Sequence, residues 1–218
     1  MNILVINGSP KGENSITLQT VRYIEKVYAA HTFEVLHAGQ KIRALEKDFA
    51  PALEMVRRAD LLLFAYPVYT FIAPSQLHRF IELLKASGAD LEGKFASQIT
   101  TSKHFYDMTA HRYIQDNCQD MGMKVIRGLS ADMDDLLCPK GQKDARDFFE
   151  FVCFSMERDV FEPFAQQHSA SQLRMHSARR QWHRLPLPLP PHTSAWLQGH
   201  GRYSSCHCRI SAHRQPGF

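Results

Sequence analysis

The chain has 218 residues, of which 44% are hydrophobic and 22% charged, and its formal net charge is +4. This length supports one ordinary domain with a full hydrophobic core and excludes two large domains. No run of about 18 apolar residues occurs and no charged leader precedes the first apolar stretch, so we expect a cytoplasmic protein without a membrane partner. The five cysteines form no CxxC pair, and their odd number and wide spacing exclude a disulfide framework.

The positive charge is concentrated at the C-terminal end. Residues 168–218 contain seven Arg and no Asp, Glu or Lys, which leaves 19 basic and 22 acidic residues in the rest, a net charge of −3. The same stretch holds seven of the twelve His and both Trp, and it shows no sustained period. We therefore predict a folded domain at residues 1–165 and an irregular Arg-, His- and Pro-rich tail at 166–218. The composition leaves two origins open for the tail, a natural disordered basic extension or a sequence read out of frame.

Two features of this tail resemble functional sites only weakly. Cys206, His207 and Cys208, with His200 and His213, could hold a metal adventitiously, but this spacing without a supporting fold does not predict a biological metal site. The arginines come without a recognised nucleic-acid-binding module. We therefore expect neither a metal nor a nucleic-acid partner.

Short apolar runs alternate with amphipathic stretches through the first 165 residues, which is the pattern of βαβ units. The apolar runs predict strands at residues 2–7, 33–37, 61–65, 95–101 and 124–129. Helical periodicity predicts helices at residues 14–30, 49–58, 74–84, 107–121 and 142–164, with a polar connection before the second. The third strand is apolar on both faces and is therefore predicted to be central. The fold class is α/β, a flavodoxin-like doubly wound sheet of five parallel strands in the order 2-1-3-4-5, with helices on both faces.

The 8–15 loop, Gly-Ser-Pro-Lys-Gly-Glu-Asn-Ser, joins the first strand to the first helix. A loop at this position directs backbone N–H groups and the positive end of the helix macrodipole toward an anion. It is neither GxGxxG nor GxxxxGK[ST], which disfavours the dinucleotide and Walker interpretations. A tight turn with an Asn or Ser helix cap is the alternative explanation. The predicted phosphate-binding residues are Ser9, Lys11, Gly12, Asn14, Ser15 and Ile16.

A second loop, residues 65–74, follows the third strand and so lies at the same edge of the sheet. In an open α/β sheet this edge, near the point where the strand order reverses, holds the ligand. The loop is rich in aromatic residues and proline, and it offers a flat apolar wall to a ring system. We predict that Pro67, Val68 and Tyr69 contact the ligand; the alternative is that they only end the strand.

These two loops together resemble the NADPH-dependent FMN reductase and iron-sulfur flavoprotein family. Members carry GSPR or GSPK followed by GN[ST], here with Glu13 inserted between Gly12 and Asn14, and a P-x-Y loop after the third strand, here Pro67 to Tyr69. The resemblance covers residues 1–165. It implies an FMN-binding, NAD(P)H-dependent oxidoreductase of the flavin or quinone reductase type, which transfers a hydride to flavin N5 and on to a small-molecule or protein acceptor. It also implies a homo-oligomer.

The resemblance further implies a role for the loop after the fourth strand, residues 100–106. In relatives this loop lies along the pyrimidine side of the flavin, so Thr101 and Ser102 are expected to donate to its O2 and N1. His104 and Tyr106 either contact substrate or cap the next helix. We name no catalytic residue, because hydride transfer to the flavin demands no side-chain acid or base.

The sequence departs from the iron-sulfur members, which ligate a cluster through four cysteines between the second and third strands. Residues 38–59 contain no Cys, so no cluster is expected. Cys118 and Cys153 are predicted to be small core side chains, and Cys138, beside Pro139, is the one of these three to test for reactivity. Two alternatives to the reductase are a flavodoxin-like electron carrier and a non-catalytic FMN-binding module. Because such carriers tend to be strongly acidic, the net charge of −3 favours the reductase.

Overall fold

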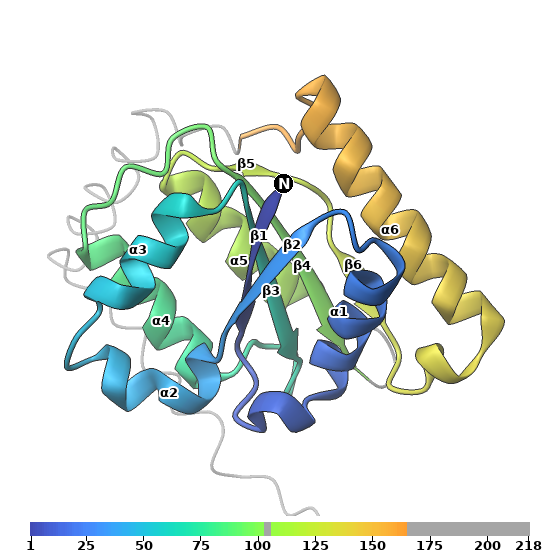
Figure 1. Cartoon of the computed structure of the whole chain (residues 1–218). Coiled ribbons are helices and arrows are strands. Elements are labelled where there is room, and N and C mark those ends of the chain that lie inside the picture. Colours follow the sequence, from blue (N-terminus) through green and yellow to red (C-terminus); the bar gives the residue numbers. More distant parts are fainter. Residues whose placement is uncertain (103–105, 165–218) are drawn as a thin grey trace, which may run out of the picture. The chain divides into compact units, whose positions relative to one another are not determined.

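The computed structural model describes residues 1–102 and 106–164 (Figure 1). The helices and strands, in chain order, are β1 (Asn2–Asn7), a 3₁₀ helix (Gly12–Asn14), α1 (Ile16–Val27), β2 (Thr32–Leu36), α2 (Ala38–Leu45), α3 (Ala50–Arg58), β3 (Leu61–Pro67), α4 (Ser75–Ala86), β4 (Phe95–Thr101), α5 (Met108–Asp120), β5 (Lys124–Val125), β6 (Leu129–Ala131), a second 3₁₀ helix (Asp135–Leu137) and α6 (Pro139–Arg158).

The strands form one parallel sheet in the order β2-β1-β3-β4-β5, with β6 also paired to β4. Val5 in β1 lies beside Val35 in β2 and Leu63 in β3, and Ala65 in β3 lies beside Ile99 in β4. The predicted doubly wound, flavodoxin-like order is confirmed. The chain reverses its direction across the sheet between β1 and β3, so the loops after these strands flank the switch point.

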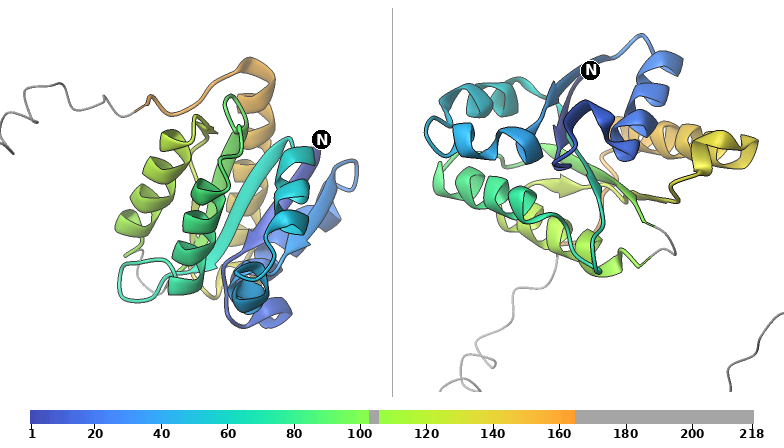
Figure 2. Two further views of the ribbon diagram at one scale, coloured as in Figure 1. Left: turned by 90° about the vertical axis from the view of Figure 1, so that its left-hand side faces the viewer. Right: turned by 90° about the horizontal axis from the view of Figure 1, so that it is seen from below.

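Helices cover both faces of the sheet, α1 and α6 on one and α2 to α5 on the other (Figures 1 and 2). Because successive strand residues point to opposite faces, Leu62 and Phe64 pack under one layer while Leu61 and Leu63 pack under the other. All four are at most 1% exposed. The prediction that the third strand is central and buried on both faces is correct. Each such side chain stabilises the fold by about 1.5–3 kcal/mol.

Three elements differ most from the prediction. The segment predicted as a polar connection forms α2, whose Ala38, Ile42 and Leu45 pack on the core at helical spacing. The fifth strand is interrupted between Val125 and Leu129. The last helix ends at Arg158 rather than at residue 164, because the next residue, Asp159, has a left-handed φ of 52°.

The cysteines Cys118 and Cys153 belong to the core, as predicted. Cys118 is 1% exposed and Cys153 packs against the α1/α6 layer, and burial raises the pKa of both thiols. Cys138 caps α6 instead, where its Sγ accepts a hydrogen bond from the backbone N–H of Gly141 at 3.4 Å. Its reactivity stays a prediction.

No helix in residues 1–102 and 106–164 is long and apolar enough to cross a membrane. The predicted tail, including Cys206, His207 and Cys208, lies outside the described residues, and so does His104. The domain boundary at residue 165 stays a prediction.

Candidate functional site

The three predicted loops meet at the carboxyl edge of the sheet. The Gly8 N–H donates to the Ala65 carbonyl at 2.9 Å, which ties the first loop to the end of β3. The Val68 N–H donates to the Thr101 carbonyl at 3.0 Å, which ties the second loop to the third. Thr17, in the first turn of α1, lies with its Oγ1 2.5 Å from Oγ1 of Thr101. The N-terminus of α1 is therefore joined directly to the end of β4.

The 8–15 loop has the form expected of an anion site. Gly12 has a φ of +57°, which a residue with a side chain rarely adopts, and the turn around it is 3₁₀. Ser9 and Ser15 are 1% and 2% exposed, whereas the side chains of Lys11 and Asn14 face solvent. The first N–H groups of a helix have no partner within the helix, so those that begin α1 at Ile16 are directed out of its N-terminus beside the loop.

The structure contains the tight turn of the alternative explanation but not its side-chain capping bond. Ser15 occupies the N-cap position of α1 with extended backbone, but its side chain makes no capping hydrogen bond. The Ser9 hydroxyl accepts from the Lys11 N–H at 3.2 Å and keeps its own proton for a further acceptor. Both hydroxyls can therefore donate to an anion.

Helix α2, absent from the sequence prediction, presses against this loop. A Cβ at Gly39 would lie 2.4 Å from the Gly8 carbonyl oxygen, so only glycine permits this approach. A Cβ at Gly12 would likewise lie 2.6 Å from Oε1 of Gln40, so this side chain also packs closely against the loop. The loop is thus held between α1 and α2.

Asn7, the last residue of β1, forms hydrogen bonds to two positions in the loop. Its Nδ2 donates to the Gly12 carbonyl at 2.9 Å, and its Oδ1 accepts from the Ser9 N–H at 3.1 Å. Asn7 is fully buried, so these bonds are protected from water. Sequence analysis missed this residue, although a polar side chain at the end of an apolar strand was the available signal.

The second loop presents aromatic and apolar side chains to solvent. Tyr69 and Ile72 exchange two backbone hydrogen bonds, at 3.0 and 3.1 Å, around a turn whose central residues have positive φ. These are Thr70 at 50° and Phe71 at 70°, and neither is glycine. Such backbone costs on the order of 1–3 kcal/mol per residue and is found mostly at ligand sites.

This turn gives the site an outer apolar wall. The rings of Phe71 and Tyr106 meet edge to face at 5.4 Å between centroids. The large exposed apolar side chains that form the wall are Tyr69, Phe71, Ile72 and Tyr106. Pro67 and Val68 lie half-buried at its base. Tyr106 also directly precedes Asp107, the N-cap residue of α5, so substrate contact and helix capping both stay open for it.

The third loop ends a buried strand with polar side chains. Thr101 and Ser102 are 5% and 8% exposed. The Oγ of Ser102 is buried and has no hydrogen-bond partner among the described residues. A buried hydroxyl without a partner is costly, so this atom fits a site completed by a ligand.

A network around Asp107 fixes the base of this loop. Asp107 Oδ2 accepts from Thr100 Oγ1 and from Ser130 Oγ, both at 2.5 Å, and lies 3.3 Å from Nε2 of His111. Burial raises the pKa of this carboxyl, but the hydrogen bonds from His111, Ser130 and Thr100 outweigh burial and hold the pKa well below its usual range. Asp107 is therefore ionised, and both ends of the loop are tied to it.

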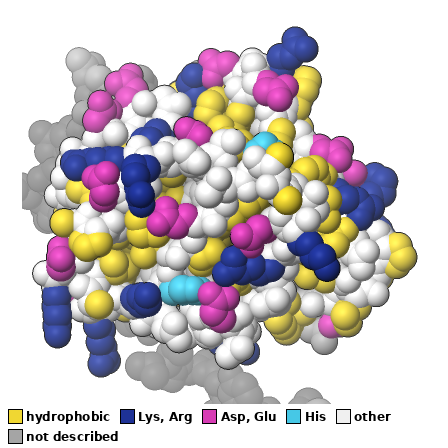
Figure 3. Space-filling view, in the orientation of Figure 1, with side chains coloured by type: hydrophobic (Ala, Val, Ile, Leu, Met, Phe, Trp, Pro, Cys, Tyr) yellow, Lys and Arg dark blue, Asp and Glu magenta, His cyan; other side chains and the backbone are white. Residues whose placement is uncertain are grey.

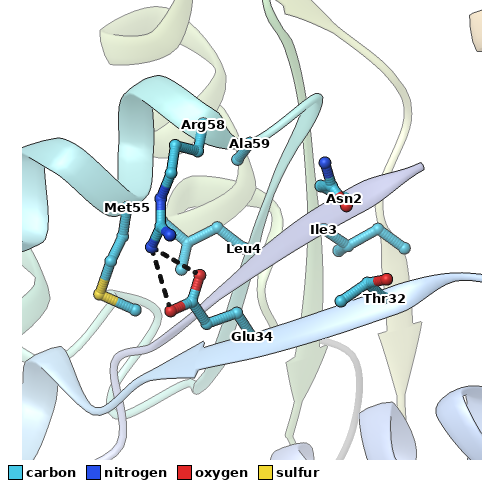
Figure 4. Close-up of a pocket in the computed structure, with 8 residues that line it drawn as sticks. All are labelled: Asn2, Ile3, Leu4, Thr32, Glu34, Met55, Arg58 and Ala59. Atoms are coloured by element: carbon cyan, nitrogen blue, oxygen red, sulfur yellow. Dashed lines mark hydrogen bonds and ion pairs between the residues drawn. The ribbon is translucent and has the colours of Figure 1, made fainter.

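A hollow of about 200 Å³ lies at the amino ends of β1 and β2 (Figure 4). Glu34 and Arg58, which line it, form an ion pair at 3.4 Å, and Leu4 and Met55 are among its apolar lining residues. Because parallel strands place their carboxyl ends at the other edge, this hollow is separate from the three loops.

A doubly wound parallel sheet in the order β2-β1-β3-β4-β5 defines a protein with the flavodoxin-like fold. Residues 1–134 match the family model of NADPH-dependent FMN reductases, and the chain belongs to that family. The predicted resemblance is thereby confirmed. A search among curated protein sequences found no match.

Several solved structures resemble this one. An FMN-dependent NADH-azoreductase from Bacillus anthracis, in complex with FMN, is 13% identical at a TM-score of 0.54, over 73% of this chain and 100% of its own. An NADH:FMN oxidoreductase in its apo form is 19% identical at a TM-score of 0.58, over 77% and 92%. A flavodoxin from the domain Archaea is 12% identical at 0.52, over 72% and 99%. At these identities the likeness shows the flavodoxin-like fold.

Family membership makes the chain an enzyme, an FMN-binding oxidoreductase that uses NAD(P)H, as the sequence predicted. The geometry fits the cofactor. The 8–15 loop supplies backbone and hydroxyl donors for a phosphate, the second loop supplies an apolar wall for a ring, and the third supplies the unpartnered Ser102 hydroxyl. Each matches one part of FMN.

Proposed function

We propose that the three loops divide FMN among them and so form the active site of a flavin or quinone reductase. Ser9, Lys11, Gly12, Asn14, Ser15 and Ile16 bind the terminal phosphate; Pro67, Val68 and Tyr69 contact the ring system; and Thr101 and Ser102 donate to its pyrimidine edge. The observation that carries the proposal is the junction of these loops through Gly8, Val68 and Thr17 at the switch point of the sheet.

The protein's part in the reaction is to bind, orient and shield. FMN, when bound, supplies the redox chemistry, which moves a hydride equivalent from NAD(P)H to an acceptor. The α1 N-terminus and the buried serines fix one end of the cofactor, and the donors near Thr101 favour negative charge at the other. The wall of Tyr69, Phe71 and Ile72 offers apolar surface to a flat acceptor such as a quinone.

The test is a titration of the full-length protein with FMN and riboflavin, followed by anaerobic oxidation of NADH and of NADPH with and without a benzoquinone. We expect FMN to bind much more tightly than riboflavin. Oxidation of NADH or NADPH should require bound FMN, and it should continue past the first turnover only when the acceptor is present. Tight FMN binding without nicotinamide oxidation would favour the electron-carrier alternative. Equal affinity for FMN and riboflavin would refute the phosphate assignment.

The remaining partner assignments rest on less. The exposed apolar wall beside the site supports a homo-oligomer, because surfaces of this kind are commonly covered by a second chain. Light scattering of the purified protein measures the oligomeric state.

On the face shown in Figure 3, basic and acidic side chains are interspersed, which gives no support for a nucleic-acid partner. The odd number and wide spacing of the cysteines favour free thiols, as expected in a reducing compartment. We therefore propose that the protein is located in the cytoplasm.

The proposed functional unit is the domain at residues 1–165. The proposal predicts that deletion of residues 170–218 leaves FMN affinity and nicotinamide oxidation unchanged. Loss of flavin-loaded protein on this deletion would show that the tail contributes to the fold or to the site.

A further inference from the structure

The hydrogen bonds of Asn7 determine which way its amide group points. The carbonyl of Gly12 can only accept, so the Asn7 atom 2.9 Å from it is the nitrogen. The N–H of Ser9 can only donate, so the Asn7 atom 3.1 Å from it is the oxygen. Each of the two backbone partners therefore identifies the orientation independently of the other.

This orientation identifies the tautomer of His37, the residue that follows β2. Nδ1 of His37 lies 3.1 Å from Nδ2 of Asn7, whose other proton points to Gly12. Because an amide nitrogen only donates, Nδ1 of His37 must be the acceptor and the ring proton must be on Nε2. His37 is mostly buried, with 14% of its side chain exposed.

Glu13, a residue of the 8–15 loop itself, is the last member of this series of hydrogen bonds. Its Oε1 lies 2.9 Å from Nε2 of His37 and accepts the proton that the tautomer places there. A carboxylate in a phosphate-binding loop would repel the ligand, but this one is directed toward His37 and toward Arg22, at 3.4 Å. Arg22 also pairs with Glu25 on its own helix at 2.8 Å.

We propose that His37 is a positioning residue for the phosphate of FMN, acting through Asn7, and that Glu13 selects the tautomer that this role needs. His37 and Glu13 hold Asn7 in the orientation that shapes the loop between Ser9 and Gly12. The loop is then preformed, and ligand binding does not have to order it. This role rests on the proposed assignment of the 8–15 loop to the phosphate.

Two conservative variants test the two hydrogen bonds of His37 separately. The amide atoms of Asn lie as many bonds from Cα as Nδ1 does, so His37→Asn keeps an acceptor for Asn7. The amide atoms of Gln lie as far out as Nε2, so His37→Gln keeps the donor to Glu13 and loses the acceptor. We expect His37→Asn to bind FMN within about twofold of the wild type, and His37→Gln to bind about fivefold more weakly, the loss expected for one hydrogen bond.

The controls distinguish this role from general stability. Riboflavin affinity should be the same in the wild type and in both variants, because riboflavin has no phosphate. Glu25→Gln, which changes the other partner of Arg22 away from the loop, should leave FMN affinity unchanged. Melting temperatures of both His37 variants show whether a loss of affinity reflects unfolding.

The ring proton can be observed without any ligand. Nitrogen-15 spectra of histidine-labelled apoprotein at pH 8, with His37 assigned by its absence in His37→Asn, should show His37 as the Nε2–H tautomer. In Glu13→Ala this signal should shift toward a mixture of tautomers. An Nδ1–H tautomer in the wild type would overturn the proposal, and so would equal FMN affinity in His37→Gln and the wild type. If the wild type itself binds FMN and riboflavin equally, the phosphate assignment fails instead.

Discussion

Replacement of Ser15 by alanine separates a phosphate-binding loop from a capped turn. Ser15 is 2% exposed at the N-terminus of α1, yet its side chain makes no capping hydrogen bond. A hydrogen bond to a charged group contributes about 1.5–3 kcal/mol, and each 1.4 kcal/mol is a tenfold change in affinity. Ser15→Ala should therefore weaken FMN binding roughly 10-fold to 150-fold.

Fold stability should change little in the same variant. Loss of a true N-cap costs about 1 kcal/mol, which lowers the melting temperature of a domain of this size by about 2–4 °C. Since Ser15 makes no such bond, we expect a shift below about 2 °C.

The assay is fluorescence titration of the apoprotein with FMN and, in parallel, with riboflavin, together with a thermal melt. Ser155→Ala is a matched control, since Ser155 is fully buried but lies on α6, away from the loops. A lower melting temperature with equal, small losses for both ligands would refute the reasoning and restore the capped-turn explanation.

Three further perturbations test neighbouring parts of the site. Lys11→Ala should weaken FMN less than fivefold, and less still in 1 M salt, because an exposed charge is screened; titrations at two salt concentrations measure this. Gly39→Ala should cost about 1–3 kcal/mol of stability and also weaken FMN, because its Cβ forces α2 away from Gly8; urea unfolding and titration measure the two effects, and unchanged values would contradict the close packing. Asp107→Ala should cost about 3 kcal/mol at pH 7, because the Thr100 and Ser130 hydroxyls lose their acceptor and His111 loses the nearby carboxylate. The folded-state pKa of Asp107 is lowered, so the stability it contributes is present above the unfolded pKa of about 3.9 and falls as the pH drops below that value. Urea unfolding should show a smaller difference in unfolding free energy between the wild type and Asp107→Ala at pH 3 than at pH 7. An equal difference at the two pH values would be inconsistent with an ionised Asp107.

Sequence patterns predicted the sheet because its core is a repeated local signal. The run from Leu61 to Ala65 is apolar on both faces, which only a central parallel strand requires, and the order of strands followed from the alternation with helices. Helix α2 was missed although Ala38, Ile42 and Leu45 have helical spacing, because the intervening residues are polar and no capping side chain marks its start.

The interruption of the fifth strand had a signal of its own. Gly128 lies within the predicted strand, and a glycine at such a position indicates a bulge or a close approach. The structure shows the approach, since a Cβ at Gly128 would lie 2.4 Å from Cγ of Gln98. Contacts of this kind join residues distant in sequence, and a single sequence does not report them.

The candidate site was predictable where its residues share one loop, and not where they come from different ones. Ser9 and Ser15 were found because they lie between a strand and a helix. His37 and Asp107 were missed because their partners, Asn7 and Ser130, come from other strands. The rule that strand ends share an edge would have placed His37 beside the first loop, but not its hydrogen bonds.

The turn at Thr70 and Phe71 keeps its shape at a cost in backbone strain. Both residues hold a backbone conformation that glycine would adopt without strain, and two hydrogen bonds between Tyr69 and Ile72 close the turn. Glycine would relax the backbone at position 71, but it would remove the ring that meets Tyr106. In the proposed site this turn forms part of the rim, so an acceptor that approaches it would meet the exposed apolar side chains of Tyr69, Phe71 and Ile72.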